Sequence, residues 1–340
     1  MKKIFITGAS GYIALHCIVN ALNKGYKVKG TVRSEYKKVE VQNCLRKHLS
    51  HPNDLELVIL DLESDEGWAK VMDGCDFLLH LASPYPFKSP KDENEIIFPA
   101  VNGTNRVLRY AKKSNIKRVI VTSSVAAISF GHSASKNTFD HNDWTKIESS
   151  SKVNAYIKSK TLAEQAAWDF ISQENNNNIK LTTVNPSAVF GPPVGENITG
   201  TSMDIIKQFI TGKFPACPNI SFSLIDVRDV AKIHLECLEN EDSINKRIIC
   251  SHSTSIKMSE IGRILNTNGF SKSPDKNLPD ILVKALALIN REMREMKVFL
   301  GVETNFNISQ TKEIFDWQPI SIEQSLLESA HSIMDIINKK

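Results

Sequence analysis

Short apolar runs alternate with longer amphipathic stretches through the first half of the chain. The stretches repeat their apolar residues with the period of a helix, and the runs have the length of buried strands. Such alternation predicts an α/β fold built on a doubly wound parallel sheet. The predicted strands are Ile4–Thr7, Lys27–Val32, Leu55–Leu60, Phe77–Ala82, Arg118–Thr122 and Lys180–Val184.

This alternation of strand-like runs and amphipathic stretches ends near Asn185. A loop rich in proline and glycine follows. Helical patterns dominate afterwards, with short strands expected near Phe222–Ile225 and Arg247–Cys250. We predict a sheet domain over residues 1–184 and a smaller, mostly helical domain over residues 185–340, and we leave open whether a segment of the second domain returns to the sheet.

Composition narrows the classes of protein and of partner. The chain has 340 residues, of which 41% are hydrophobic and 24% charged, as is ordinary for a globular protein. Its net charge of +4 comes from scattered basic residues, so we expect no nucleic-acid partner. Six widely spaced cysteines without a C-x-x-C pair indicate reduced thiols and no metal site.

The N-terminus and the apolar stretches indicate a cytoplasmic protein. The first predicted strand begins at Ile4, so cleavage of a signal peptide would remove the glycine-rich turn that follows the strand. The longest apolar stretch, from Ile281 to Ile289, contains Lys284 and is too short to span a bilayer. We therefore expect no membrane partner.

A glycine-rich turn, Thr7-Gly8-Ala9-Ser10-Gly11-Tyr12-Ile13-Ala14, connects the first strand to the first helix. Gly8 allows a tight turn, Gly11 allows the backbone to approach a phosphate, and Ala14 keeps the helix close to the sheet. The start of the helix offers amide donors and a positive dipole end to a pyrophosphate. Such turns also make ordinary connections, and it is the position between a strand and an amphipathic helix that favours a dinucleotide site.

The end of the second strand indicates which dinucleotide is bound. Enzymes that use NAD place an acidic residue there to bond the ribose 2′-hydroxyl, whereas this strand ends at Arg33, with Lys37 one helical turn further on. A guanidinium pairs bidentately with a phosphate. We therefore predict NADP (NADPH) as the cofactor, with Glu35 keeping NAD open as the alternative.

Two more strands end in residues at the expected cofactor-binding edge. Asp61 and Leu62 follow the third strand, where contacts with adenine are expected, and Ala82 and Ser83 follow the fourth, where the middle of the cofactor would lie. Taken singly, each pair could equally be a simple strand terminator.

The spacing Tyr156-x-x-x-Lys160 places a phenol and an ammonium on the same face of a helix. A tyrosine is protonated at neutral pH and can give its proton to the oxygen of a carbonyl that accepts a hydride. The positive charge of Lys160 would lower the pKa of that phenol, and its ammonium would also hold the nicotinamide ribose. A hydroxyl at the end of the fifth strand should bind the carbonyl oxygen, and we favour Ser124 over Ser123.

These elements appear in the order that a doubly wound reductase requires, and the sequence resembles the extended short-chain dehydrogenase/reductase family. Within that family it looks most similar to the dihydroflavonol-4-reductase-like branch, which includes NADPH-dependent methylglyoxal, ketone and aldehyde reductases. The resemblance covers nearly the whole chain. It is carried by Thr7–Ala14, Val121–Ser124, Asn154–Trp168, Asn185–Pro192 and Ile225–Ala231.

The resemblance implies a Rossmann domain, a second domain that binds substrate, and roles for individual residues. It implies that Ser124, Tyr156 and Lys160 are the catalytic triad and that Pro186 packs near the nicotinamide. The residues implied to line NADP are Gly8, Ala9, Ser10, Gly11, Tyr12, Ile13, Arg33, Lys37, Asp61, Leu62, Val189 and Ser202.

Two departures from the branch bear on the substrate. Cinnamoyl-CoA reductases carry Asn-Trp-Tyr-Cys-Tyr before their lysine, and this chain has Asn154-Ala155-Tyr156-Ile157-Lys158, which disfavours that substrate. Flavonoid reductases place an asparagine where this chain has Ser129, which argues against dihydroflavonol itself. A pocket with apolar walls for an aldehyde or ketone is expected from Tyr85, Phe87, Ser129 and Phe130.

The sequence therefore predicts an NADPH-dependent oxidoreductase that transfers hydride to a small or aromatic aldehyde or ketone, as a monomer or homodimer. One alternative is a nucleotide-sugar epimerase or dehydratase of the same family, which Arg33 disfavours because those enzymes generally use NAD. The other is a regulator that senses NADP without turnover, which the retention of Tyr156 and Lys160 disfavours.

Overall fold

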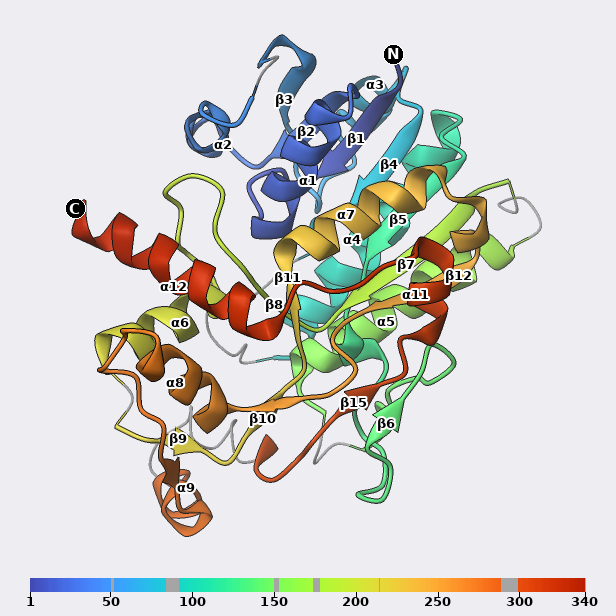
Figure 1. The fold of residues 1–340 in the computed structure, drawn as a ribbon. Coiled ribbons are helices and arrows are strands. Elements are labelled where there is room, and N and C mark those ends of the chain that lie inside the picture. The colour runs from blue at the N-terminus through green and yellow to red at the C-terminus, as the bar shows by residue number, and fades with distance from the viewer. Residues whose placement is uncertain are drawn as a thin grey trace.

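The computed structural model describes residues 1–49, 52–83, 92–149, 153–173, 178–213, 215–288 and 299–339. Its central element is a seven-stranded sheet in the order β12-β7-β5-β4-β1-β2-β3, with every neighbouring pair parallel (Figure 1). The strands are β1 Lys3–Thr7, β2 Lys27–Val32, β3 Leu55–Ile59, β4 Phe77–His80, β5 Arg118–Thr122, β7 Lys180–Pro186 and β12 Lys246–Cys250.

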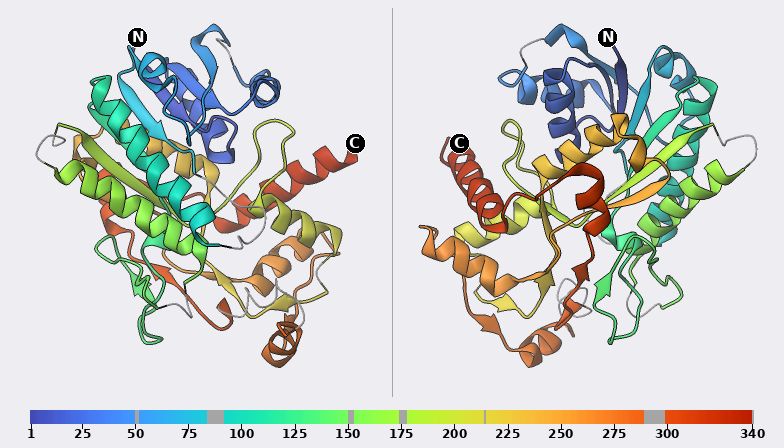
Figure 2. Two further views of the ribbon diagram at one scale, coloured as in Figure 1. Left: turned by 180° about the vertical axis from the view of Figure 1, so that it is seen from behind. Right: turned by 45° about the vertical axis from the view of Figure 1, so that its right-hand side comes forward.

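Helices cover both faces of this sheet (Figure 2). Neighbouring residues of β1 point to opposite faces, so Ile4 and Ile6 belong to one apolar core while Phe5 belongs to the other. The first core is completed by α1 (Tyr12–Asn23), α2 (Glu35–Leu45) and α7 (Val227–Glu239). The second is completed by α3 (Trp68–Met72), α4 (Asn94–Lys113) and α5 (Ala155–Ser172).

A third apolar core lies outside the sheet, in the second half of the chain. It is built around the buried side chains of Phe190, Phe209 and Ile261. The helices of this half are α6 Thr201–Thr211, α8 Met258–Thr267, α9 Asp280–Leu286, α11 Ser309–Phe315 and α12 Ile322–Asn338, and α6, α8 and α12 surround the core at the lower left of Figure 1.

Short strand pairs connect the loops around this second half. Three pairs are parallel: β8 (Ala188–Phe190) with β11 (Leu224–Asp226), β9 (Cys217–Pro218) with β14 (Asn277–Leu278), and β6 (Thr138–Phe139) with β15 (Asn305–Phe306). One is antiparallel, β10 (Ser221–Phe222) with β13 (Ile256–Lys257).

The α/β class and the doubly wound parallel sheet predicted from the sequence are confirmed. The central sheet extends through Pro186, and β12 from the second half of the chain pairs with β7. Because all seven strands are parallel, their carboxyl ends lie along one edge, and ligands of such folds bind beside that edge. None of the helices described by the structure is long and apolar enough to cross a lipid bilayer.

Candidate active site

The turn between β1 and α1 is held in one conformation by its glycines. Gly8 has φ +70°, and a Cβ at this position would lie 2.9 Å from the Cα of Ala82, so only glycine fits without strain. The Gly11 amide donates to the Gly8 carbonyl at 2.9 Å and closes the turn. Gly11 is also the N-cap of α1 and has no side chain to cap it. The first amides of α1 are therefore open to an anion.

The ends of β1 and β4 are joined by one hydroxyl. Thr7 Oγ1 accepts hydrogen bonds from the amides of Leu81 (3.1 Å) and Ala82 (3.0 Å), so its own proton goes to His80 Nδ1 at 2.8 Å. His80 thus carries its proton on Nε2. Burial, together with the nearby Lys160 charge, lowers the pKa of His80 to about 3 and keeps it neutral. The sequence pattern gave Thr7 no role beyond its place in the turn and did not indicate His80.

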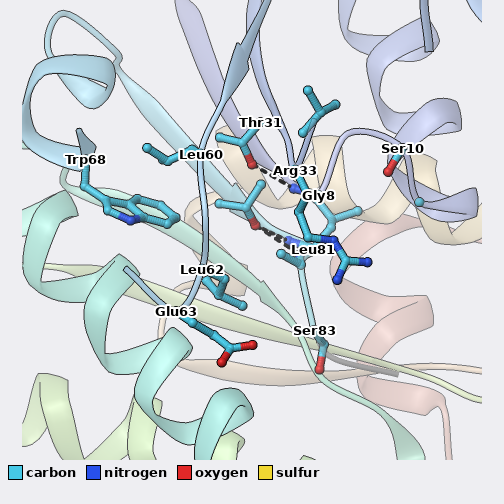
Figure 3. Close-up of a pocket in the computed structure, with 14 residues that line it drawn as sticks. Gly8, Ser10, Thr31, Arg33, Leu60, Leu62, Glu63, Trp68, Leu81 and Ser83 are labelled. Atoms are coloured by element: carbon cyan, nitrogen blue, oxygen red, sulfur yellow. Dashed lines mark hydrogen bonds between the residues drawn. The ribbon is translucent and has the colours of Figure 1, made fainter. Parts of the chain in front are cut away.

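A cavity lies on the β2 and β3 side of the glycine turn (Figure 3). Of the predicted cofactor residues, it is lined by Gly8, Ser10, Gly11, Arg33, Leu62, Ala82 and Ser83. Its other lining residues, which the sequence pattern did not indicate, include Thr31, Leu60, Glu63 and Trp68. Arg33 and Trp68 lie on opposite sides of this cavity in Figure 3.

Arg33 and Lys37 have different surroundings. Arg33 is exposed at the cavity and makes no ion pair with any residue that the structure describes. Lys37 Nζ instead binds Glu40 Oε2 at 2.6 Å on its own helix and lines a different cavity, beside the loop at residues 193–199. The structure therefore presents one of the two predicted cations to the cofactor cavity.

Asp61 and Leu62 also differ in where their side chains lie. Asp61 Oδ1 accepts a hydrogen bond from the Glu63 amide at 2.9 Å, which makes a local turn, and the Asp61 side chain does not line the cavity. Leu62 and Glu63 both do. A signal for Glu63 was available, since it lies three residues beyond the end of the predicted strand Leu55–Leu60, but the pattern alone did not separate it from Asp61.

A second cavity lies on the other side of the glycine turn. It shares Gly8, Gly11 and Leu81 with the first and extends to the start of α6. The predicted residues Tyr12, Ile13 and Ser202 line it. Tyr12 also donates its hydroxyl to the Gly191 carbonyl at 2.7 Å, which ties α1 to the loop that follows β8. The two cavities therefore lie on either side of the glycine turn.

Lys37, Asp61, Tyr156 and Lys160 line neither cavity, and three more of the predicted cofactor residues also lie outside both. Ala9 is fully buried, and its amide donates to the Thr31 carbonyl at 2.8 Å. Pro186 is the last residue of β7 and is buried, and Val189 lies half-buried in β8, where it pairs with Ile225 of β11.

Ser124 lies directly beyond the carboxyl end of β5. Its Oγ accepts a hydrogen bond from the Ala126 amide at 3.1 Å, which starts a short 3-10 helix over Val125–Ala127, and donates weakly to the Pro186 carbonyl at 3.4 Å. The hydroxyl is therefore held at the sheet edge by its own turn.

Tyr156 and Lys160 lie at the start of α5. Asn154 caps this helix by accepting from the Ile157 amide at 2.9 Å, which makes Tyr156 the second residue of the helix. Tyr156 packs against the apolar cluster of Ala126, Val153 and Ile157, and Ala126 lies two residues beyond Ser124. The phenol-bearing turn of α5 thus packs on the segment that carries the predicted serine.

Lys160 is half-buried one turn further along α5. Burial lowers the pKa of its ammonium to about 8, and the carboxylate of Glu164 opposes that shift. The described part of the chain gives this ammonium no hydrogen bond or ion pair. The Lys160 charge also contributes to lowering the pKa of His80, the last residue of β4.

The substrate residues are described only in part. Tyr85 and Phe87 lie outside the described residues. Ser129 and Phe130 line a third cavity of about 440 Å³, in which Phe130 packs edge to face on Phe299 with ring centroids 6.0 Å apart. Phe130 also packs against the same apolar cluster as Tyr156, so this cavity begins beside the start of α5.

Comparison with known proteins places the chain in a family. The model of the NAD dependent epimerase/dehydratase family matches residues 4–250. The NADPH-dependent methylglyoxal reductase GRE2 of Saccharomyces cerevisiae is 33% identical over 284 residues, which cover 78% of this chain and 82% of the relative. A cinnamoyl-CoA reductase of Medicago truncatula is 35% identical over 266 residues, 77% of this chain and 79% of the relative, although this chain lacks the pentapeptide noted above.

Solved structures agree with this placement. The crystal structure of yeast methylglyoxal/isovaleraldehyde reductase Gre2 complexed with NADPH matches with a TM-score of 0.81 and 25% identity, covering 99% of this chain and 100% of the other. That of Gre2 from Candida albicans in complex with NADPH matches with a TM-score of 0.80 and 29% identity, covering 99% of each chain. The chain belongs to the NAD dependent epimerase/dehydratase family, which is the extended short-chain dehydrogenase/reductase family, and within it to the dihydroflavonol-4-reductase-like branch.

Proposed function

We propose that this protein is an NADPH-dependent carbonyl reductase that converts an aldehyde or ketone to the alcohol. The observation that carries the proposal is the packing of the Tyr156 turn of α5 on the segment of Ser124. Lys160 lies one helical turn further along α5, and its charge acts on His80 at the end of β4. The relatives named as NADPH-dependent reductases, and their structures with NADPH, support the same reaction.

The residues around the glycine turn fit NADPH. A Cβ at Gly8 would collide with the backbone at Ala82, so the turn is built for close approach. The open amides of α1 suit a pyrophosphate. Arg33 is an exposed guanidinium at the cavity beside the turn, and it makes no ion pair with the residues that the structure describes. We propose that Arg33 takes the 2′-phosphate and that Leu62 and Glu63 flank the adenine.

When bound, NADPH supplies the hydride that reduces the carbonyl carbon. Ser124 binds the carbonyl oxygen through its hydroxyl, and Tyr156 gives its phenolic proton to that oxygen as negative charge develops there. Lys160 supports this step because a positive charge near the phenol favours the phenolate. Its ammonium, which has no internal partner among the described residues, is also available to hold ribose hydroxyls.

We further propose how the two halves of the chain divide the work. Residues 1–184, completed by β12, bind the cofactor, and residues 185–340 cover the substrate from the other side of the sheet edge. The third cavity, with Phe130, Phe139 and Phe299 in its walls, suits a small or aromatic carbonyl compound. All six cysteines are buried and unpaired, which supports the prediction of a cytoplasmic enzyme.

The test is a turnover assay with the purified protein. Reduced cofactor is supplied with methylglyoxal, isovaleraldehyde, an aromatic ketone or a sugar nucleotide, and oxidation of the cofactor is followed by its near-ultraviolet absorbance while the alcohol is identified by chromatography. We expect NADPH to be consumed in step with alcohol formation, and faster than NADH. Binding of NADPH with no turnover of any carbonyl would contradict the proposal and favour a regulator.

A further inference from the structure

A buried carboxylate lies one helical turn beyond Lys160. Glu164 is 1% exposed, on the inner side of α5, and both of its oxygens accept hydrogen bonds. The four partners from the central sheet and its edge, which with Glu164 we call the Glu164 cluster, are Ser123 Oγ at 2.5 Å, Thr183 Oγ1 at 3.0 Å, Asn185 Nδ2 at 2.7 Å and Arg247 Nε at 2.6 Å. Trp168 Nε1 adds a longer bond at 3.3 Å.

Arg247 supplies the matching positive charge. Its side chain is 9% exposed, and its guanidinium also donates to the backbone carbonyls of His141 (2.9 Å) and Asp143. The guanidinium stacks over the Trp144 ring at 3.8 Å. Arg247 therefore connects β12 to the loop between β5 and α5, and Glu164 balances its charge inside the protein.

The Glu164 cluster holds the strand end that carries Ser124. Ser123, the residue before it, donates directly to Glu164. Asn185 donates both to Glu164 Oε2 at 2.7 Å and to the Ser124 carbonyl at 3.2 Å. Any movement of the Glu164 carboxylate would therefore shift the backbone on both sides of Ser124.

The charge of Glu164 also acts on Lys160. The two residues are four apart on α5 and share one face of the helix. The charged and titratable groups near Lys160 come from α5 itself (Tyr156 and Glu164) and from β4, where His80 is neutral. The neighbouring Lys158 pairs outward with Glu93, just before α4, and Arg247 lies behind Glu164 on β12. Among the described residues, Glu164 is the anion that offsets the burial of the Lys160 ammonium.

We propose that Glu164 is a positioning residue of the active site: it fixes Ser124 through Ser123 and Asn185, and it supplies the buried negative charge that acts on the Lys160 ammonium. This inference rests on the proposed function, in which Ser124 and Lys160 act on substrate and cofactor. It predicts that removal of the Glu164 charge makes Lys160 lose its proton at lower pH, with consequences for cofactor binding as well as for turnover.

The first experiment measures NADPH affinity against pH for the wild type and for Glu164→Gln, by quenching of tryptophan fluorescence. The wild-type affinity should weaken as pH rises through the Lys160 pKa of about 8. In Glu164→Gln the loss of NADPH affinity should begin about one pH unit lower, because the Lys160 ammonium no longer has the nearby Glu164 carboxylate to stabilise its charge. Lys160→Met should abolish this alkaline dependence, which identifies the titrating group.

Two matched variants separate charge from simple disruption of structure. Thr183→Val removes one hydrogen bond of Glu164 and keeps its charge, so the pH midpoint of NADPH affinity should stay at the wild-type value. Glu164→Asp keeps the charge on a shorter side chain and should restore the midpoint. If Glu164→Gln does not fold, the double variant Glu164→Gln/Arg247→Met removes both buried charges, and its midpoint should still fall below that of the wild type.

The outcomes distinguish this inference from the proposed function. Coincident pH profiles of NADPH affinity for Glu164→Gln and the wild type would overturn the role of Glu164, whatever the activity. So would an equal shift in Thr183→Val, because it would trace the effect to packing. A lower pH midpoint of NADPH affinity in Glu164→Gln, together with an absence of turnover in the wild type, would support the role of Glu164 and contradict the proposed reductase activity.

Discussion

The Glu164 cluster and the glycine turn between β1 and α1 lie at the same edge of the sheet and differ in how their polar groups are used. In the Glu164 cluster, each of the two carboxylate oxygens accepts hydrogen bonds from the protein. At the turn, the N-cap of α1 has no side-chain bond, and the exposed Arg33 has no ion pair among the described residues. One region is complete without a ligand and the other is not.

The difference indicates which of the two regions maintains the structure of the site and which binds a ligand. A buried polar group without a partner costs free energy, so a network that is complete in the free protein holds its neighbours rigidly. Donors left open at a surface crevice cost little, since water satisfies them until a ligand does. Mutations in the Glu164 cluster should therefore affect stability and geometry, and cofactor binding only through the charge on Lys160, whereas mutations at the crevice should affect binding directly.

The largest expected effect is on chemistry. Tyr156→Phe removes the proposed proton donor and should lower kcat by about 10³-fold, within the range for loss of a general acid. The Kd for NADPH should change by less than about threefold, since the phenylalanine ring can still pack against the apolar cluster of Ala126, Val153 and Ile157. Stopped-flow rates and fluorescence titration measure the two quantities, and a kcat within tenfold of the wild type would remove Tyr156 from the proton transfer.

Next in size is the loss of the buried charge pair. Glu164→Ala leaves the Arg247 guanidinium buried without a counter-ion and should lower the free energy of unfolding by about 3 kcal/mol or more. Denaturant unfolding followed by circular dichroism gives the value. A loss below about 1 kcal/mol would mean that the Glu164 cluster does not carry the rigidity we assign to it.

Cofactor choice should depend on Arg33 more than on Lys37. Arg33→Asp should reduce the ratio of kcat/KM for NADPH over NADH by about 100-fold, because a guanidinium–phosphate pair is lost and repulsion is added. Lys37→Ala is the matched control. Lys37 already pairs with Glu40 in the wild type, so its replacement should change the ratio by less than about fivefold. Equal effects of the two variants would contradict the separation of these cations that the structure shows.

The smallest effect concerns the contact between the turn and the second half of the chain. Tyr12→Phe removes the hydrogen bond to the Gly191 carbonyl and should cost about 1 kcal/mol of stability. NADPH affinity should fall only slightly, because the amides of α1 are unchanged. Thermal unfolding with and without NADPH checks both points, and an unchanged melting temperature would show that this hydrogen bond contributes nothing to stability.

Much of this architecture follows from local pattern. The succession of strands along the chain, the glycine turn and the Tyr156–Lys160 spacing depend on residues close together in the sequence, so periodicity and turn chemistry predict them. The pairing of Lys37 with Glu40 and the turn made by Asp61 are choices between nearby partners of similar energy, which a pattern does not resolve. The Glu164 cluster joins α5 to β7 and β12, and its partners are visible only when the sheet is assembled.

The most direct test of hydride and proton transfer at this edge uses NADPH deuterated at the transferable position, with methylglyoxal as the carbonyl. The account predicts that deuterium appears on the carbinol carbon of the product, with a slower rate than for unlabelled NADPH, and that Tyr156→Phe and Lys160→Met both suppress the transfer while binding NADPH. Deuterium retained in the cofactor after incubation with every carbonyl tried, or full transfer in Tyr156→Phe, would contradict it.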